Sequence, residues 1–195
     1  MRLKLLAAAT GLFLLSTPAP AQRPPDSAAL IAAQREAMAK LAFLDGVWRG
    51  EAWTIRPDGS RHEIVQTERI GTFLEGAVRV IEGRGYEPDG KVGFNALGIV
   101  SYDPGTRAYN LHSYAMGRKG DFPFKVTADG YVWEVPAGPG AIIRYTATVG
   151  DGKFREVGYR IAGEAPPVQI FEMNLRRVGD TKWPLMDPVP MRGKR

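Results

Sequence analysis

The chain has 195 residues, no cysteine, two histidines and a formal net charge of +5 at pH 7. The absence of cysteine excludes disulfide bonds, thiolate metal sites and a cysteine-linked lipid anchor. Basic and acidic residues are interspersed along most of the sequence, which is typical of a solvated surface and not of a nucleic-acid-binding stripe. This length is sufficient for one domain whose core is stable without disulfides.

The first 21 residues have the composition of a secretory signal peptide. Arg2 and Lys4 form a basic start, residues 5–15 are largely apolar, and residues 19–21 (Ala-Pro-Ala) form the small-x-small pattern that signal peptidase cleaves. The apolar run is shorter than the roughly 20 residues that a membrane-spanning helix needs. We therefore expect cleavage before Gln22, a periplasmic or secreted mature chain, and no membrane insertion. Removal of Arg2 and Lys4 lowers the net charge from +5 to +3.

The rest of the chain predicts one helix followed by many strands. Residues 22–45 are expected to form a linker and an amphipathic helix, which Asp26 or Ser27 can cap. From Gly46 onward, turn signals rich in Pro, Asp and Gly separate short apolar runs, which predict strands at 47–55, 61–70, 76–84, 92–102, 108–116, 121–127, 131–136, 141–149, 153–161 and 168–178. These runs predict an all-β fold, an antiparallel meander of about ten strands closed into a barrel over residues 46–179. Residues 180–195 are expected to be a Pro-rich basic tail.

Alternation along the expected strands indicates which side chains face the interior. We expect a cavity for a small, largely apolar molecule, with aromatic rings and a few polar tips in its wall, formed by His112, Tyr114, Trp133, Tyr145, Phe171 and Met173. His62 is expected at the surface. The alternative is a solid barrel whose interior side chains fill the core, in which case the basic tail would be the contact surface for a partner.

Few residues fit a catalytic site. Gly-x-Ser-x-Gly does not occur, and a Ser-His-Asp relay would depend on His62 or His112, so a serine hydrolase is not expected. The two histidines show no metal-ligand spacing. An acid–base catalyst that uses His112 with a carboxylate such as Glu156 is the second hypothesis. Glu156 and Glu172 could be neighbours on adjacent strands, as in a glycosidase, but surface acids are the default interpretation of such residues.

Gly46-Val47-Trp48 follows the expected helix and opens the first strand. This motif resembles the Gly-x-Trp signature of lipocalin-like (calycin) barrels. The extended pattern, which continues through residues 73–76 and 98–104, resembles an uncharacterised family of secreted bacterial lipocalin-like domains. The resemblance covers about residues 41–178 and implies a barrel in which Trp48 plugs one end. It also implies that Arg176 or Arg177 of the last strand stacks on Trp48 as a cation–π contact.

Gly-x-Trp-x-Gly is also similar to the opening of nitrobindin-like haem barrels, in which a histidine near the last strand holds the haem iron. The corresponding segment, residues 167–173, contains no histidine, and Met173 is its one candidate axial ligand. A buried methionine usually serves packing, so we expect no haem and no metal. A haem-dependent enzyme on the same barrel is kept as an alternative. The expected partner is a small apolar molecule and not nucleic acid. The oligomeric state stays open.

Overall fold

The computed structural model describes residues 26–182. The expected signal peptide, residues 22–25 and residues 183–195 lie outside this part. Asp26 caps α1 (Ser27–Ala39) by accepting a hydrogen bond from the Ala28 N–H, and the short helix η1 (Ala42–Leu44) leads into the sheet. The strands are β1 (Gly46–Ile55), β2 (Arg61–Phe73), β3 (Val78–Tyr86), β4 (Val92–Asp103), β5 (Ala108–Ala115), β6 (Arg118–Val126), β7 (Gly130–Pro136), β8 (Ala141–Gly150), β9 (Lys153–Ala162) and β10 (Val168–Gly179). Within residues 26–182, no helix is long and apolar enough to cross a membrane.

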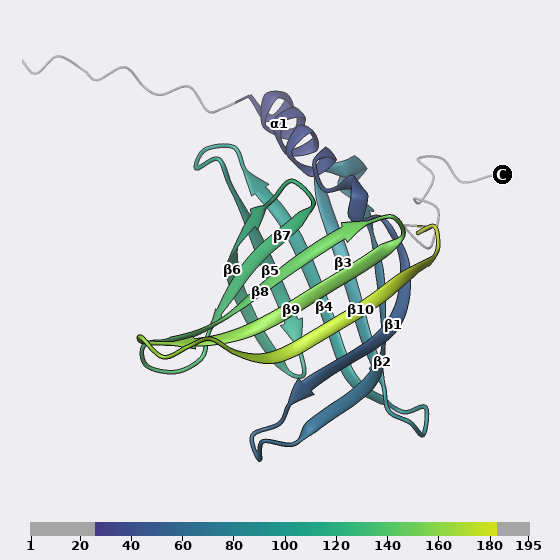
Figure 1. The fold of residues 1–195 in the computed structure, drawn as a ribbon. Coiled ribbons are helices and arrows are strands. Elements are labelled where there is room, and N and C mark those ends of the chain that lie inside the picture. The colour runs from purple at the N-terminus through teal and green to yellow at the C-terminus, as the bar shows by residue number, and fades with distance from the viewer. Residues whose placement is uncertain (1–25, 183–195) are drawn as a thin grey trace, which may run out of the picture.

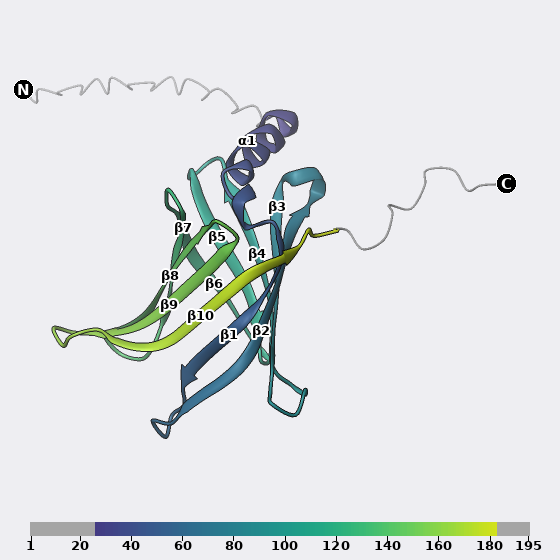
Figure 2. The ribbon, with the colours of Figure 1, turned by 45° about the vertical axis from the view of Figure 1, so that its right-hand side comes forward.

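The strands form one closed antiparallel barrel (Figure 1 and Figure 2). Each strand pairs with its neighbours in sequence, and β1 closes the barrel by pairing with β10. The prediction of an all-β antiparallel meander preceded by one helix is confirmed. Every described strand has a neighbour on both sides, although β6 and β7 pair only through residues 124–126 and 131–133.

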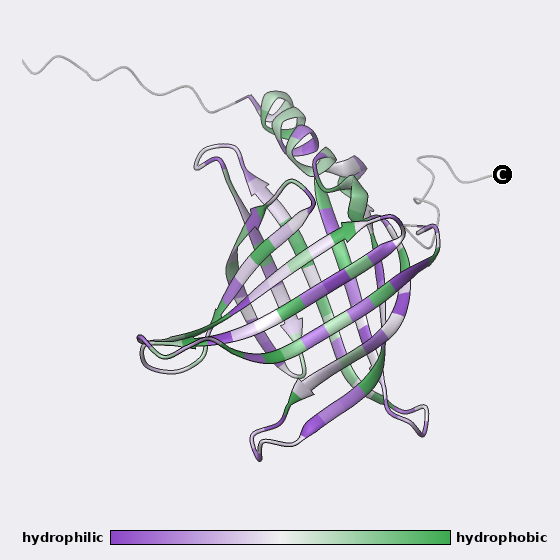
Figure 3. Ribbon diagram, in the orientation of Figure 1, coloured by the Kyte–Doolittle hydropathy of each residue, from purple (hydrophilic) through white to green (hydrophobic). Residues whose placement is uncertain are grey.

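Alternate residues of each strand face the interior, and the cross-strand pairs carry this phase around the barrel. The pairs Phe124↔Trp133 and Trp133↔Tyr145 place aromatic rings on the inner face of β6, β7 and β8. Figure 3 shows the resulting alternation of hydrophilic and hydrophobic positions along β8, β9 and β10. On the wall formed by β3, β4 and β5, the inner positions include the larger Ile81, Phe94 and Leu111 and five small residues, namely Gly83, Ala96, Gly98, Ser113 and Ala115.

One end of the barrel is closed and packed. The Trp48 side chain is 2% exposed, donates from Nε1 to the Leu44 carbonyl oxygen at 2.9 Å, and contacts the Phe154 ring edge-on. α1 lies across this end (Figure 1), where Met38 and Leu41 join the core. Burial of these large apolar side chains is the main stabilising contribution here, and it closes the barrel at the end where β1 begins.

The contact expected on Trp48 from the last strand is absent among residues 26–182. Arg177 is the cross-strand partner of Trp48, but its guanidinium donates to the Asp45 carbonyl oxygen and pairs with Asp180. Arg176 is exposed and pairs across the ladder with Arg49 on the outer face. The cation–π contact that is present among the described residues joins Arg61 and the Trp53 ring. Asp45 and Asp180 engage the Arg177 guanidinium at the start of β1, next to a β-bulge between Val47 and Trp48.

A buried arginine stabilises the closed end instead. Arg79 is 1% exposed, and its Nε and Nη2 atoms donate to the two carboxylate oxygens of Asp45 at 2.7 and 2.8 Å. Its Nη1 atom also donates to the Met38 carbonyl oxygen at the end of α1. One side chain of β3 therefore satisfies the helix end and fixes the segment that leads from α1 into β1.

We predict that Asp45→Ala destabilises the protein more than Arg79→Met. D45A leaves the guanidinium buried without its counter-charge, which typically costs about 3–5 kcal/mol. R79M removes the buried charge, and the remaining Asp45 side chain is 37% exposed and solvated. Urea unfolding at neutral pH measures both changes.

The matched control is Arg144→Met, which breaks an ion pair with Glu134 whose side chains are 49% and 41% exposed. Its cost should stay below about 1 kcal/mol. Equal losses in D45A and R79M would contradict the prediction.

Candidate functional site

The barrel encloses a cavity of about 730 Å³. It extends from the packed end toward the hairpins opposite α1, where Arg56, His62 and Arg118 line it. The small inner residues of β3, β4 and β5 leave space that larger side chains would fill. Gly98 and Ser113 contribute to this wall. The space at these positions therefore results from the small side chains of three strands.

The facing wall is aromatic. Trp133 and Tyr145 stack with ring centroids 4.5 Å apart, and Tyr145 meets Phe171 edge-on at 5.6 Å. Met173 continues this wall and is 2% exposed. The structure thus places four of the six predicted lining residues in the cavity wall: Trp133, Tyr145, Phe171 and Met173.

The other two predicted lining residues, His112 and Tyr114, lie on the outer face of the barrel. Tyr114 is 53% exposed, whereas Leu111 on the same strand is 6% exposed and faces inward. The inner face of β5 carries Leu111, Ser113 and Ala115. The predicted phase of this strand is therefore reversed, because its larger polar and aromatic residues point to solvent and its small residues line the cavity.

His62 is the histidine that lines the cavity, near its mouth, and the sequence placed it at the surface instead. Its Nε2 atom lies 2.9 Å from a carboxylate oxygen of Glu87, and its side chain is 21% exposed. The positions of the two histidines are thus opposite to those expected. The register of β1 with β2 decides this, because Thr54 pairs with His62 on the inner face.

Two carboxyl groups face the interior from β2 and β9. Glu68 is 8% exposed, and burial raises its pKa to about 8, with smaller contributions from the negative charges of Glu156 and Glu82. The amide Nε2 of Gln66 donates to Glu68 Oε1 at 2.7 Å. Glu68 Oε2 is buried and has no hydrogen-bond partner within residues 26–182. A buried acceptor without a hydrogen-bond partner destabilises the folded protein, so this oxygen indicates where a ligand could donate a hydrogen bond.

The second carboxyl group, Glu156, belongs to the aromatic wall. It is 8% exposed, and burial raises its pKa to about 7. Trp133 Nε1 donates to its Oε1 at 2.9 Å, and a hydrogen bond from Tyr131 also favours the charged form. Burial, together with the nearby Glu156 charge, raises the pKa of Tyr145 to about 12. Near neutral pH this pair of carboxyl groups can both accept and donate protons.

Neither expected pairing of Glu156 is formed. His112 lies on the outer face and Glu156 on the inner face, so the barrel wall separates them. Glu172 lies on the outer face, where Arg155 donates to it. Glu156 was among the candidate residues in the sequence, whereas Glu68 was not. The signal for Glu68 is the alternation along β2, because Ile64, Gln66, Glu68 and Ile70 all lie on the same face of this strand.

A hydrogen-bonded chain of Ser101, His112 and Asp121 crosses the outer faces of β4, β5 and β6. Ser101 Oγ lies 3.2 Å from His112 Nε2, and His112 Nδ1 lies 2.5 Å from Asp121 Oδ1. A Ser-His-Asp arrangement was not expected from the sequence. The imidazole is 42% exposed and the carboxylate 71% exposed, whereas a catalytic relay holds a buried carboxylate beside a substrate pocket. None of the three residues lines the cavity.

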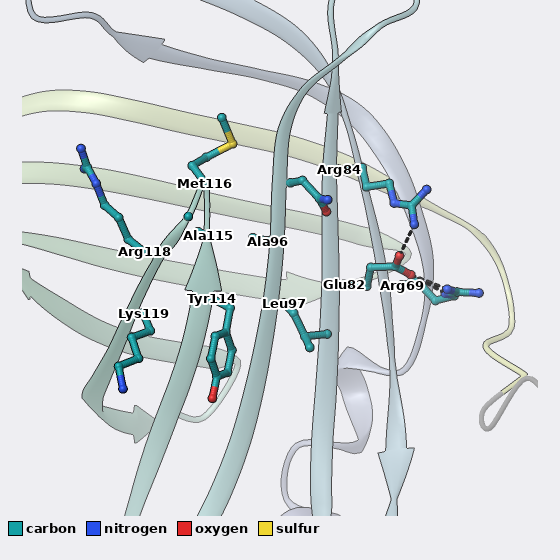
Figure 4. A pocket seen from close by; sticks show the side chains of 12 residues that line it. Arg69, Glu82, Arg84, Ala96, Leu97, Tyr114, Ala115, Met116, Arg118 and Lys119 are labelled. Carbon is teal, nitrogen blue, oxygen red and sulfur yellow. Dashed lines mark hydrogen bonds and ion pairs between the residues drawn. The ribbon is translucent and has the colours of Figure 1, made fainter.

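Tyr114 borders a separate depression of about 710 Å³ on the outer wall (Figure 4). Its rim includes Arg118 and Lys119, and the ion pairs of Glu82 with Arg69 and Arg84 lie across from them. Glu82 pairs with both arginines, and Arg84, Arg118 and Lys119 are exposed, which is typical of a surface. The enclosed aromatic cavity is the stronger candidate site.

The donor set does not fit the haem of nitrobindin-like barrels. Met173 is packed in the wall, and the described part of β10 carries no histidine. His62, the imidazole that lines the cavity, lies near its mouth and is engaged by Glu87. Within residues 26–182, no group of three or more metal-ligating side chains comes together.

Comparison with solved structures gives one instructive likeness. The crystal structure of Rv2717c from M. tuberculosis superposes with a TM-score of 0.55 at 14% sequence identity, over 73% of this chain and 97% of that chain. No protein-family model matches the chain, and no curated protein matches it in sequence. At this identity the likeness shows the fold alone, a closed barrel, and the lipocalin-like resemblance remains a resemblance.

We predict that Glu68→Gln makes stability less dependent on pH. The folded-state pKa of Glu68 is raised from 4.5 to about 8, so the folded protein holds this proton more tightly than the unfolded chain. Stability therefore falls as pH rises through that window. Glutamine mimics the protonated form, and E68Q should gain on the order of 3 kcal/mol over the parent near pH 9 and almost nothing near pH 4.

Urea unfolding across this pH range measures the difference, with the exposed Glu134→Gln as the control that should show no such trend. If the difference in free energy of unfolding between E68Q and the parent stays constant with pH, the raised pKa of Glu68 is refuted.

Proposed function

We propose that the protein binds a small, largely apolar molecule inside the barrel. The observation that carries the proposal is the cavity of about 730 Å³ with an aromatic wall on one side and small residues on the other. Ligand sites in proteins are typically concave, mostly apolar and about 300–1,000 Å³ in volume. The packed end at Trp48 closes the cavity on one side, so we place ligand entry at the opposite hairpins.

The small inner residues favour this function over a solid barrel. Gly98 and Ser113 pair across β4 and β5 and face the Trp133–Tyr145 stack over the cavity. A barrel that served only as a rigid scaffold would gain several kcal/mol from larger residues at such positions, since filled cores are more stable. An apolar molecule with a flat ring would bury its faces against the stack.

Binding of N-phenyl-1-naphthylamine, a neutral apolar dye whose fluorescence rises in apolar surroundings, tests the proposal. We expect saturable binding with one site per chain. Ser113→Trp projects an indole into the cavity and should weaken binding by at least about tenfold, because overfilling removes the space for the ring. The neighbouring Tyr114→Trp makes its change on the outer face and should leave affinity unchanged.

Circular dichroism and thermal unfolding establish that both variants are folded. Should S113W fail to fold, Ala96→Leu provides a smaller filling change in the same wall. Absence of saturable dye binding to the parent protein would refute the proposal, and so would equal affinity in all folded variants.

We further propose that the chain is exported. The basic start, apolar run and Ala-Pro-Ala pattern of residues 1–21 support this. Expression of the full chain in a bacterial host should yield a periplasmic product whose mass corresponds to a chain beginning at Gln22. Ala21→Lys should block cleavage and retain the longer chain. Accumulation of uncleaved parent protein in the cytoplasm would contradict export.

A further inference from the structure

The cavity holds acidic groups without a cationic partner. Glu68 and Glu156 lie on its inner face from β2 and β9, and they interact electrostatically. In the described chain neither forms an ion pair, although eleven other ion pairs are present, all of which use other carboxylates. The cations that line the cavity, Arg56 and Arg118, come from the hairpins at its mouth. The ionised forms of these two carboxyl groups therefore have no counter-charge in the interior.

The Glu68 carboxyl group has one oxygen with a hydrogen-bond partner and one without. Gln66 donates to Oε1, and Oε2 has no partner among residues 26–182 while being buried. Gly83 on β3 lies against the carboxyl group, since a Cβ at this position would come within 2.8 Å of Oε1 and 3.0 Å of Oε2. The glycine thus gives the carboxyl group the space to lie flat on the wall. What the site lacks is a hydrogen-bond donor that carries positive charge.

The aromatic wall near Glu156 suits the same kind of group. The Trp133 ring stacks on Tyr145 and directs its Nε1–H at the carboxylate. Aromatic faces attract cations, and the attraction is stronger where water is excluded. A bound anion would face two carboxyl groups and the negative faces of these rings, so anions are disfavoured here.

We propose that the ligand is an organic cation, an apolar or aromatic body that carries a protonated amine which binds to Glu68 and Glu156. This inference rests on the proposed function. The ammonium group would donate to Glu68 Oε2 and contribute the missing positive charge. The apolar body would occupy the space between the Trp133–Tyr145 stack and the small residues of the facing wall.

Binding of such a cation is linked to pH. The groups that face the two carboxyls from the surrounding elements are Gln66 on β2, Tyr131 and Trp133 on β7, and Tyr145 on β8, while Gly83 and the outward Glu82 flank Glu68 on β3. Burial raises the pKa of both carboxyls, to about 8 and about 7. An ammonium group must displace their protons, so affinity for the amine should rise with pH between about 6 and 8.

Displacement of N-phenyl-1-naphthylamine by two matched compounds tests the inference. One is 2-(2-naphthyl)ethylamine, which is protonated in this pH range, and the other is 2-(2-naphthyl)ethanol, which is neutral and of nearly the same shape. We expect the amine to bind at least about tenfold more tightly at pH 8, with its advantage shrinking toward pH 6. Glu68→Gln should remove most of this advantage and leave the affinity for the alcohol unchanged.

Glu134→Gln, an exposed carboxylate on the outer face, is the control and should change neither affinity. Glu156→Gln is the second variant in case E68Q does not fold, and the pH profile of the parent protein needs no variant. Equal binding of amine and alcohol, or an amine advantage that survives in folded E68Q and E156Q, overturns the inference while dye binding keeps the proposed function. Failure of the dye and both compounds to bind overturns the two together.

Discussion

The pairing of β1 with β10 is the constraint on which the rest of the molecule depends. Closure fixes the register all the way round, so one phase decides for every strand which side chains are enclosed. The enclosed side chains include Trp48 of β1, which lies opposite Glu68 of β2, and Met173 of β10, which lies opposite Glu156 of β9. Packing at the closed end and the acidic groups of the cavity are therefore consequences of a single register. A slip of one residue would expose the core and enclose the charged outer face.

The interior combines two environments with opposite requirements. Near α1 the space is filled, and the buried Arg79 is satisfied by Asp45 and by the end of the helix. Farther along, the space is left open, and Glu68 is buried with one oxygen unsatisfied. Proteins rarely leave both volume and hydrogen-bonding capacity unused in the same place. The stabilisation from the packed end offsets the cost of the open one, which is the usual relation between a scaffold and a binding site.

Much of the fold could be predicted from the sequence, because turn residues delimit the strands and β-branched and aromatic residues fill them. The site could be predicted only in part. On β8 and β10, apolar and polar residues alternate clearly. The alternation predicts that Tyr145 and Phe171 face the interior, and both line the cavity. On β5 the small inner residues carry little hydrophobic signal, so the larger His112 was assigned to the wrong face. A glutamate such as Glu68 is usually a surface residue. Its burial follows from the pairing of β2 with β1, which sets it opposite Trp48, and this pairing between separate strands cannot be seen in the local sequence.

The described chain enters β1 and leaves β10 at the same end of the barrel, under α1 (Figure 1). The opposite rim consists entirely of hairpin loops, at residues 56–60, 87–91, 116–117, 137–140 and 163–167. Such loops tolerate insertions because they join strands whose pairing is already determined. The rim can thus diversify in length and composition without disturbing the closure or the helix. A family of related chains could alter what is admitted to the cavity while keeping the same interior, and selectivity at the entrance could evolve independently of stability.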